Sequence, residues 1–78
     1  MRTEEEVREM YRQYVYRYAI ADLNGQRMSA NQYFGASVAC GRTLGRNMKR
    51  INKDFGIAKN FIKRTREEGK TLPGFKAV

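Results

Sequence analysis

Apolar and aromatic side chains recur every three or four residues along the first third of this 78-residue chain. The members of this stripe are Val7, Tyr11, Tyr14, Val15 and Tyr18. Such spacing places side chains on one face of an α-helix, whereas a strand would alternate them between two faces. Thr3 and Glu6 form a capping-box signature before the stripe, and Asn24-Gly25 tolerates the positive φ of a helix end. The pattern predicts a helix over residues 4–23.

A second capping-box signature, Ser29 with Gln32, precedes a longer apolar seam. The seam repeats at alternating spacings of three and four through Phe34, Ser37, Gly41, Leu44, Met48, Ile51 and Phe55. Three glycines interrupt it, and each costs about 1 kcal/mol relative to alanine inside a helix. Close approach of another helix to Gly41-x-x-x-Gly45 would explain two of them, and so would a break into two shorter helices. We expect one helix over residues 30–55.

Gly56 follows the seam and is expected to end this helix, because glycine readily takes the left-handed conformation. Helical spacing then resumes, which predicts a third helix over residues 57–68 that Gly69 ends. A short C-terminal tail follows it. The expected fold class is therefore all-α: a small bundle of about three helices that forms a single domain, residues 1–78.

The net charge of the chain lies entirely in its second half. Residues 1–40 contain five basic and five acidic side chains, whereas residues 41–78 contain eleven basic and three acidic ones, which accounts for the formal charge of +8. Clustered positive charge is the electrostatic signature of a nucleic-acid-binding surface. We expect the neutral half, residues 1–40, to build the core and the basic half, residues 41–70, to bind a negatively charged partner.

The chain has no histidine and a single cysteine, Cys40. It therefore lacks the commonest general base and the side chains of the usual zinc sites, which argues against an enzyme and against any metal or other cofactor. The lone thiol excludes an internal disulfide and is typical of a reducing compartment. Because there is neither a signal-like leader nor a run of about 18 apolar residues, we expect a cytoplasmic protein without a membrane partner.

Four cations follow helical spacing of four, three and four residues, and a fifth, Arg50, lies close to them. We call the four the basic stripe: Arg42, Arg46, Lys49 and Lys53. On one helix they would share a face, where they could neutralise successive phosphates and release condensed counterions. An acidic protein surface and a merely solvated polar face are the alternatives. Asp54 is the only acid between residues 41 and 66, which favours a polyanion.

Residues 48–64 resemble the helix-turn-helix of resolvases, transposases and small bacterial or phage regulators. The matching apolar and turn positions are Ile51, Phe55, Gly56, Ile57 and Ile62. The resemblance implies a recognition helix after Gly56 whose Lys59, Asn60, Lys63 and Arg64 face the major groove. It also implies that Lys49, Arg50 and Lys53 contact the phosphate backbone.

Tyr16 lies off the apolar stripe of the first helix and is the best candidate for an aromatic side chain that faces a partner. Together with Met10 and Ile20 it would form an apolar interface, and the glycines at 41 and 45 offer a second close-approach surface. Because dimers read two half-sites on DNA, these surfaces favour a homodimer.

These observations favour a small non-enzymatic DNA-binding protein that combines a basic helix stripe with a helix-turn-helix-like C-terminal segment. DNA is favoured over RNA, although the stripe alone carries no sequence information. The alternative is a small helical inhibitor or adaptor of phage or mobile-element type. Such a protein would use the same cations to dock on an acidic protein or a nucleoprotein surface.

Overall fold

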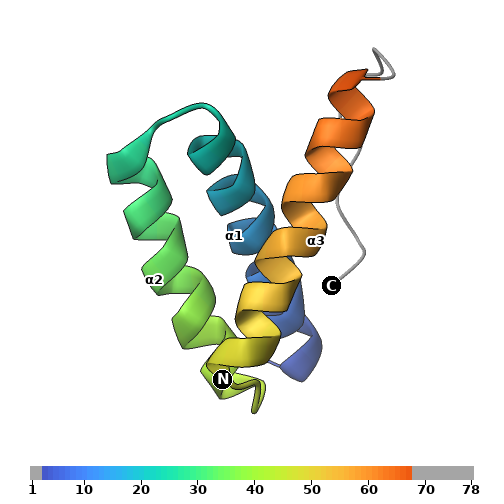
Figure 1. The fold of residues 1–78 in the computed structure, drawn as a ribbon. Helices are drawn as coiled ribbons and strands as arrows, with labels where there is room; N and C mark the ends of the chain where they lie inside the picture. Colours follow the sequence, from blue (N-terminus) through green and yellow to red (C-terminus); the bar gives the residue numbers. More distant parts are fainter. Residues whose placement is uncertain (1–2, 68–78) are drawn as a thin grey trace.

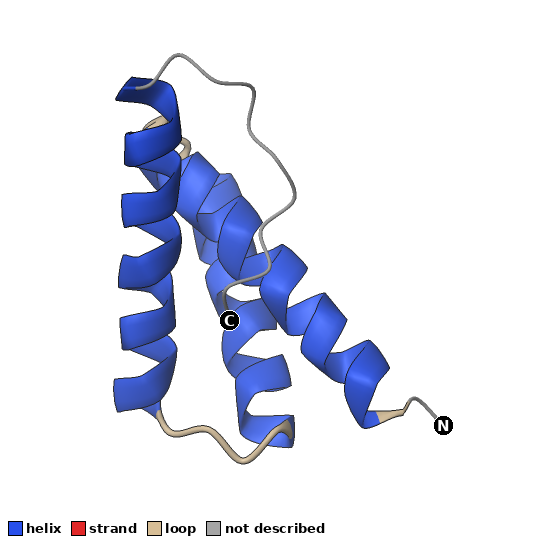
Figure 2. Cartoon of the chain, turned by 90° about the vertical axis from the view of Figure 1, so that its right-hand side faces the viewer, coloured by secondary structure: helices blue, strands red, loops and turns tan. Residues whose placement is uncertain are grey.

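Three helices joined by short links make up the computed structural model, which describes residues 3–67 (Figure 1). They are α1 (Glu4–Leu23), α2 (Arg27–Thr43) and α3 (Met48–Glu67). α2 and α3 diverge from the link that joins them, and α1 packs against both (Figures 1 and 2). The predicted all-α fold of three helices is confirmed. The predicted C-terminal tail and the residues after Glu67 lie outside the described part of the chain.

α1 begins and ends where the sequence predicts. The Thr3 hydroxyl accepts a hydrogen bond of 3.2 Å from the Glu6 backbone N–H, as an N-cap does. At the other end Gly25 has a φ of +74°, and the backbone N–H of Gln26 donates to the Ala21 carbonyl over 2.9 Å. This is the Schellman arrangement, in which a left-handed glycine lets the chain satisfy the last carbonyls of the helix.

α2 begins at Arg27, three residues before the predicted start. Gln26 is the N-cap, and its side chain makes no capping hydrogen bond. Ser29 and Gln32, which the sequence suggested as a capping box, lie inside the helix instead. The chain re-enters a helix directly after the Gly25 turn because the Gln26 carbonyl already accepts from the Ala30 N–H over 2.9 Å.

The predicted helix over residues 30–55 is wrong, because the chain turns at Gly45. Gly45 has a φ of +80°, and the Arg46 N–H donates to the Gly41 carbonyl over 2.8 Å in a second Schellman arrangement. Asn47 then starts α3, since its side-chain oxygen accepts from the Arg50 N–H over 2.9 Å. The break into two helices, the alternative that the glycines left open, is therefore what the structure shows.

α3 runs through Gly56 without a turn, so the predicted helix boundary at residues 55–57 is also wrong. The buried residues of α3 continue across this point at spacings of four, three, four and three: Ile51, Phe55, Ala58, Ile62 and Thr65. Gly56 lies on the exposed side, and Ile57 is 37% exposed rather than folded over a helix end. An unbroken apolar stripe buries more side chains on the core than a second turn would.

The core lies between α1 and α3, with α2 closing one side. Its members are Tyr11, Val15, Ala19, Ile51, Phe55, Ala58 and Ile62. α2 approaches closely because Gly41 has no side chain; a Cβ there would lie 2.7 Å from the Cδ1 of Ile51. The partly buried Cys40 packs against this core. No helix within residues 3–67 combines the length and apolar character needed to cross a bilayer.

Candidate nucleic-acid interface

The basic stripe does not lie on one helix. Arg42 is in the last turn of α2, Arg46 is in the link, and Lys49 and Lys53 belong to α3. The turn at Gly45 interrupts the helical spacing on which the predicted alignment depended. The four cations therefore do not form the continuous face that the sequence suggested.

A buried carboxylate neutralises part of the positive charge. The Asp54 side chain is fully buried, and its Oδ2 accepts from Arg46 Nη1 over 3.0 Å. Its Oδ1 accepts from Arg50 Nε over 3.1 Å. Sequence reasoning treated Asp54 as a lone acid in a basic segment. The position of Asp54 between Ile51 and Phe55, within the buried stripe of α3, indicates a structural role.

Tyr11 of α1 completes this buried cluster. Its hydroxyl donates to Asp54 Oδ2 over 2.5 Å, and the Arg46 guanidinium carbon lies 4.8 Å from the centre of the Tyr11 ring. Burial raises the pKa of Tyr11, and the hydrogen bond and negative charge of Asp54 raise it further. The phenol therefore stays neutral and serves as a donor, so the cluster ties α1, the link and α3 together.

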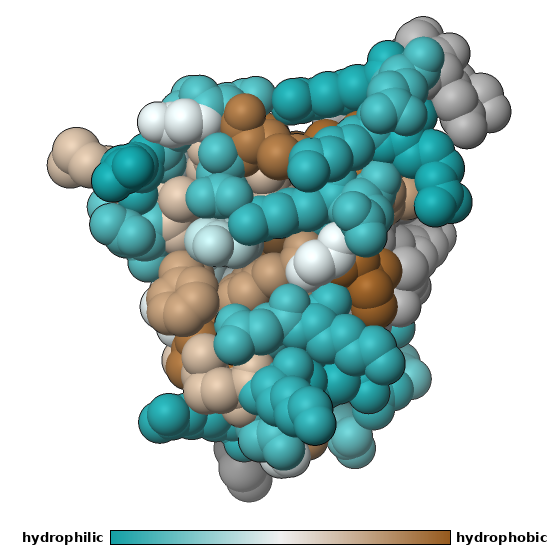
Figure 3. Space-filling model, viewed as in Figure 1, coloured by the Kyte–Doolittle hydropathy of each residue, from teal (hydrophilic) through white to brown (hydrophobic). Residues whose placement is uncertain are grey.

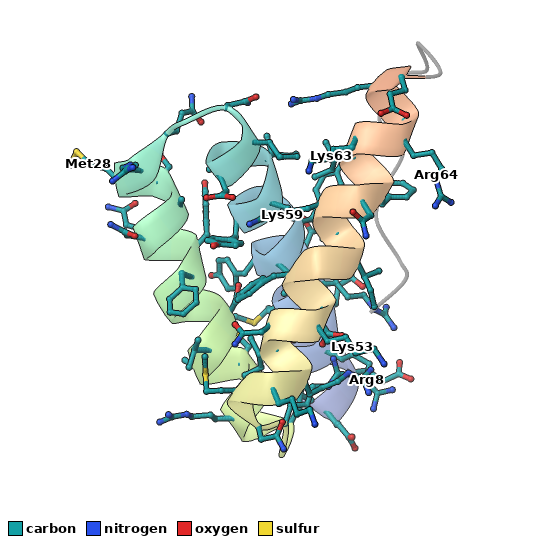
Figure 4. All side chains as sticks on the ribbon, in the orientation of Figure 1. Arg8, Met28, Lys53, Lys59, Lys63 and Arg64 are labelled. Atoms are coloured by element: carbon teal, nitrogen blue, oxygen red, sulfur yellow. The ribbon has the colours of Figure 1, made fainter. Side chains whose placement is uncertain are left out.

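Lys59 points toward α1 instead of toward an external partner. Its Nζ lies 2.6 Å from an Asp22 carboxylate oxygen and 5.4 Å from the centre of the Tyr18 ring. The hydrogen bond to Asp22 raises the pKa of Lys59. The expectation that Lys59 faces a DNA groove is not supported, because its charge is paired within the fold (Figure 4).

The exposed side of α3 opposite the core carries the remaining candidates. We call it the outer face of α3, and its residues are Lys49, Asn52, Lys53, Gly56, Asn60, Lys63 and Arg64. None of its four cations forms an ion pair with any residue in the described part of the chain. At the C-terminal end of this face, Glu67 contributes one acidic side chain. Hydrophilic side chains dominate the side of the molecule that α3 presents, with apolar patches showing between them (Figure 3).

Positive charge lies on both flanks of this outer face. At about 100° per residue, Lys53 and Arg64 fall on one flank and Lys63 on the other, as their side chains show (Figure 4). Lys49, Gly56 and Asn60 lie between the flanks, so this centre carries one charge, that of Lys49 in the first turn of α3. A helix with cations on both flanks has a charge distribution that suits a position between two rows of anions.

Comparison with known proteins assigns this chain to no family. No known protein family matches the chain, and no curated protein or solved structure is significantly similar to it. Residues 3–67 contain no group of three acidic or cysteine side chains placed to hold a metal ion. The outer face of α3 must therefore be interpreted from its own chemistry.

The predicted apolar interface is not an exposed patch. Met10, Tyr16 and Ile20 are all only partly exposed, and the Tyr16 ring lies 6.4 Å from that of Phe61. Burial raises the pKa of Tyr16. Met10 is six residues from Tyr16, which places it about 120° away around the helix.

The predicted glycine surface does not form either. Gly41 is buried against the core, whereas Gly45 lies in the turn between α2 and α3. Close approach at Gly41 occurs within this chain, so that glycine is not available to a second molecule.

Proposed function

We propose that this protein binds double-stranded DNA through the outer face of α3. The observation that carries the proposal is the row of unpaired cations from Lys49 to Arg64, which spans about 22 Å of helix. Each cation that neutralises a phosphate releases condensed counterions, and this release supplies most of non-specific affinity for a duplex. Three cations that are paired within the fold, Arg46, Arg50 and Lys59, are left out of this surface.

The charge distribution fits the major groove of B-form DNA. A helix with its side chains is about 10–12 Å wide and the groove is about 12 Å wide, so the flanks of α3 would lie beside the two phosphate backbones. Asn60 near the centre of this face would then reach base edges, where asparagine pairs with adenine. The major groove of A-form RNA is too narrow for a helix, which favours DNA.

The test is the salt dependence of binding to a random duplex of about 20 base pairs. Lys53→Gln and Lys63→Gln should each weaken binding and reduce the slope of log K against log salt by about 1. Arg27→Gln is the matched control, because it removes one exposed charge from the start of α2 and should have a smaller effect. Wild-type affinity that stays weaker than millimolar at low salt would overturn the proposal.

We also propose that the protein binds DNA as a homodimer. A single short helix contacts few base pairs, whereas two copies would read two half-sites. Light scattering with and without DNA tests it. A mass of one chain per half-site with no cooperativity on DNA would contradict it.

An acidic protein partner is the second candidate. It is favoured by a shallow hollow beside the outer face of α3, lined by Ile57, Asn60, Phe61 and Arg64, where apolar contacts could supplement ion pairs. Under this alternative, binding to a purified acidic partner should survive nuclease treatment and should be weakened by Arg64→Gln. The same variant would leave such binding unchanged if the hollow played no role.

A further inference from the structure

We infer that Arg50 is a pre-positioned phosphate ligand and that Asp54 is its positioning residue. The inference rests on the proposed function, because it places one more anion-binding side chain beside the outer face of α3. Arg50 differs from the other candidates in being both anchored and accessible. Its side chain is 53% exposed, while that of Asp54 is fully buried.

The anchor is a single hydrogen bond at one edge of the guanidinium. Arg50 Nε donates to Asp54 Oδ1 over 3.1 Å, and neither terminal nitrogen of Arg50 donates a hydrogen bond in the described part of the chain. Those nitrogens form a planar fork whose geometry matches two oxygens of a phosphate. Arg50 can therefore keep its internal contact while it binds an external anion.

Asp54 is itself held in place. Its second oxygen accepts from the Tyr11 hydroxyl over 2.5 Å and from Arg46 over 3.0 Å. A carboxylate fixed by groups from α1 and from the link cannot follow Arg50 outward. An unanchored arginine would lose its rotamer freedom when it binds a phosphate. Arg50 has already lost part of that freedom on folding.

The cluster keeps a positive charge. Two arginines, Arg46 and Arg50, share one carboxylate, so an approaching anion meets a net attraction. Arg50 is also three residues from Lys53, which places it next to the same flank of α3. The guanidinium group of Arg50 and the ammonium group of Lys53 would contact the same phosphate backbone there.

The test compares substitutions that conserve charge. Arg50→Lys keeps the charge but removes the fork and the Nε anchor. We expect it to weaken binding of the 20-base-pair duplex about tenfold, the loss expected for one charged hydrogen bond, while the salt slope stays unchanged. Arg27→Lys is the matched control, since it makes the same exchange at an exposed residue of α2 outside the outer face of α3, and should change affinity less than about twofold.

Asp54→Asn gives a second measurement, for which simple electrostatics and loss of the Arg50 anchor predict opposite changes in DNA affinity. The change removes a negative charge, so simple electrostatics predicts tighter DNA binding. Loss of the anchor predicts weaker binding, and this is the result we expect. Circular dichroism must first show that the Asp54→Asn protein is folded. If Asp54→Asn does not fold, Arg50→Lys alone decides.

The outcomes separate this inference from the proposed function. A wild-type protein that does not bind duplex DNA overturns the proposed function itself. A wild-type protein that binds, with Arg50→Lys within twofold of it, overturns only the role of Arg50.

Discussion

The Tyr11 hydroxyl donates a 2.5 Å hydrogen bond to the fully buried carboxylate of Asp54. Forty-three residues separate the two in sequence, so the bond fixes α1 against α3. A buried carboxylate without partners would be strongly destabilising. Here Arg46 and Arg50 supply charge while Tyr11 supplies a neutral donor. The helices are therefore positioned by polar contacts as well as by their apolar core.

Tyr11→Phe should lower the free energy of unfolding by about 1.5–3 kcal/mol, because it removes a buried hydrogen bond to a charged group. Tyr14→Phe is the matched control. The Tyr14 ring packs 6.4 Å from that of Tyr33, and the Tyr14 side chain is partly exposed. Removing its hydroxyl should therefore lower the free energy of unfolding by less than about 0.5 kcal/mol. Urea denaturation measures both, and equal effects would contradict the role given to Asp54.

Gly41→Ala should destabilise the protein by about 1–3 kcal/mol through overpacking. The new methyl group would lie 2.9 Å from Cγ1 of Ile51 and 3.0 Å from the Tyr11 ring, and both side chains are fully buried. Gly35→Ala provides the comparison, because nothing lies within 4 Å of a Cβ there. Thermal denaturation should show Gly35→Ala slightly stabilised, by about 0.5–1 kcal/mol.

Gly56→Ala and Gly45→Ala should have opposite signs. Gly56 lies in an exposed part of α3 with open space around it, so alanine should stabilise the helix by about 0.5–1 kcal/mol. Gly45 has a φ of +80°, so alanine there should cost about 1–2 kcal/mol. A destabilised Gly56→Ala variant would indicate that the chain turns at residue 56 after all.

Tyr11 should be the last of the five tyrosines to ionise at high pH. Burial first, and then Asp54, raise its pKa above the usual value. Because the folded pKa exceeds the unfolded one, this contribution to stability is complete below about pH 10 and is lost as the pH rises further. In an ultraviolet titration, the last phenolate should appear together with loss of helical circular dichroism. Tyr11→Phe should abolish that final step and leave the earlier ones.

The sequence allowed α1 to be predicted closely because every signal there is local. Thr3, the apolar stripe and Gly25 act within a few residues of one another. The second and third helices were misplaced because Gly45 and Gly56 look alike in sequence. Gly56 lies opposite a buried stripe that continues past it, whereas Gly45 is followed by Asn47, a strong N-cap residue. The N-cap at Asn47 is thus a local signal for a helix that starts at residue 48.

The placement of the candidate residues on α3 was predicted in part. Lys49, Lys53, Asn60, Lys63 and Arg64 do share the exposed side of α3. Arg46 and Lys59 do not, because their partners Asp54 and Asp22 are brought to them by the packing of separate elements. Spacing along one helix predicts which side chains share a face. It cannot predict which of them meet an acid on another part of the chain.

Folding places different demands on the two sides of α3. Ile51, Phe55, Ala58 and Ile62 hold the helix to its neighbours, and no residue of the outer face contributes to the buried core. Under the proposed function, exchanging Asn52, Gly56 or Asn60 in a randomised library would alter target preference with little loss of stability. In evolution the same separation would let the exposed side chains of α3 change while the architecture stays constant.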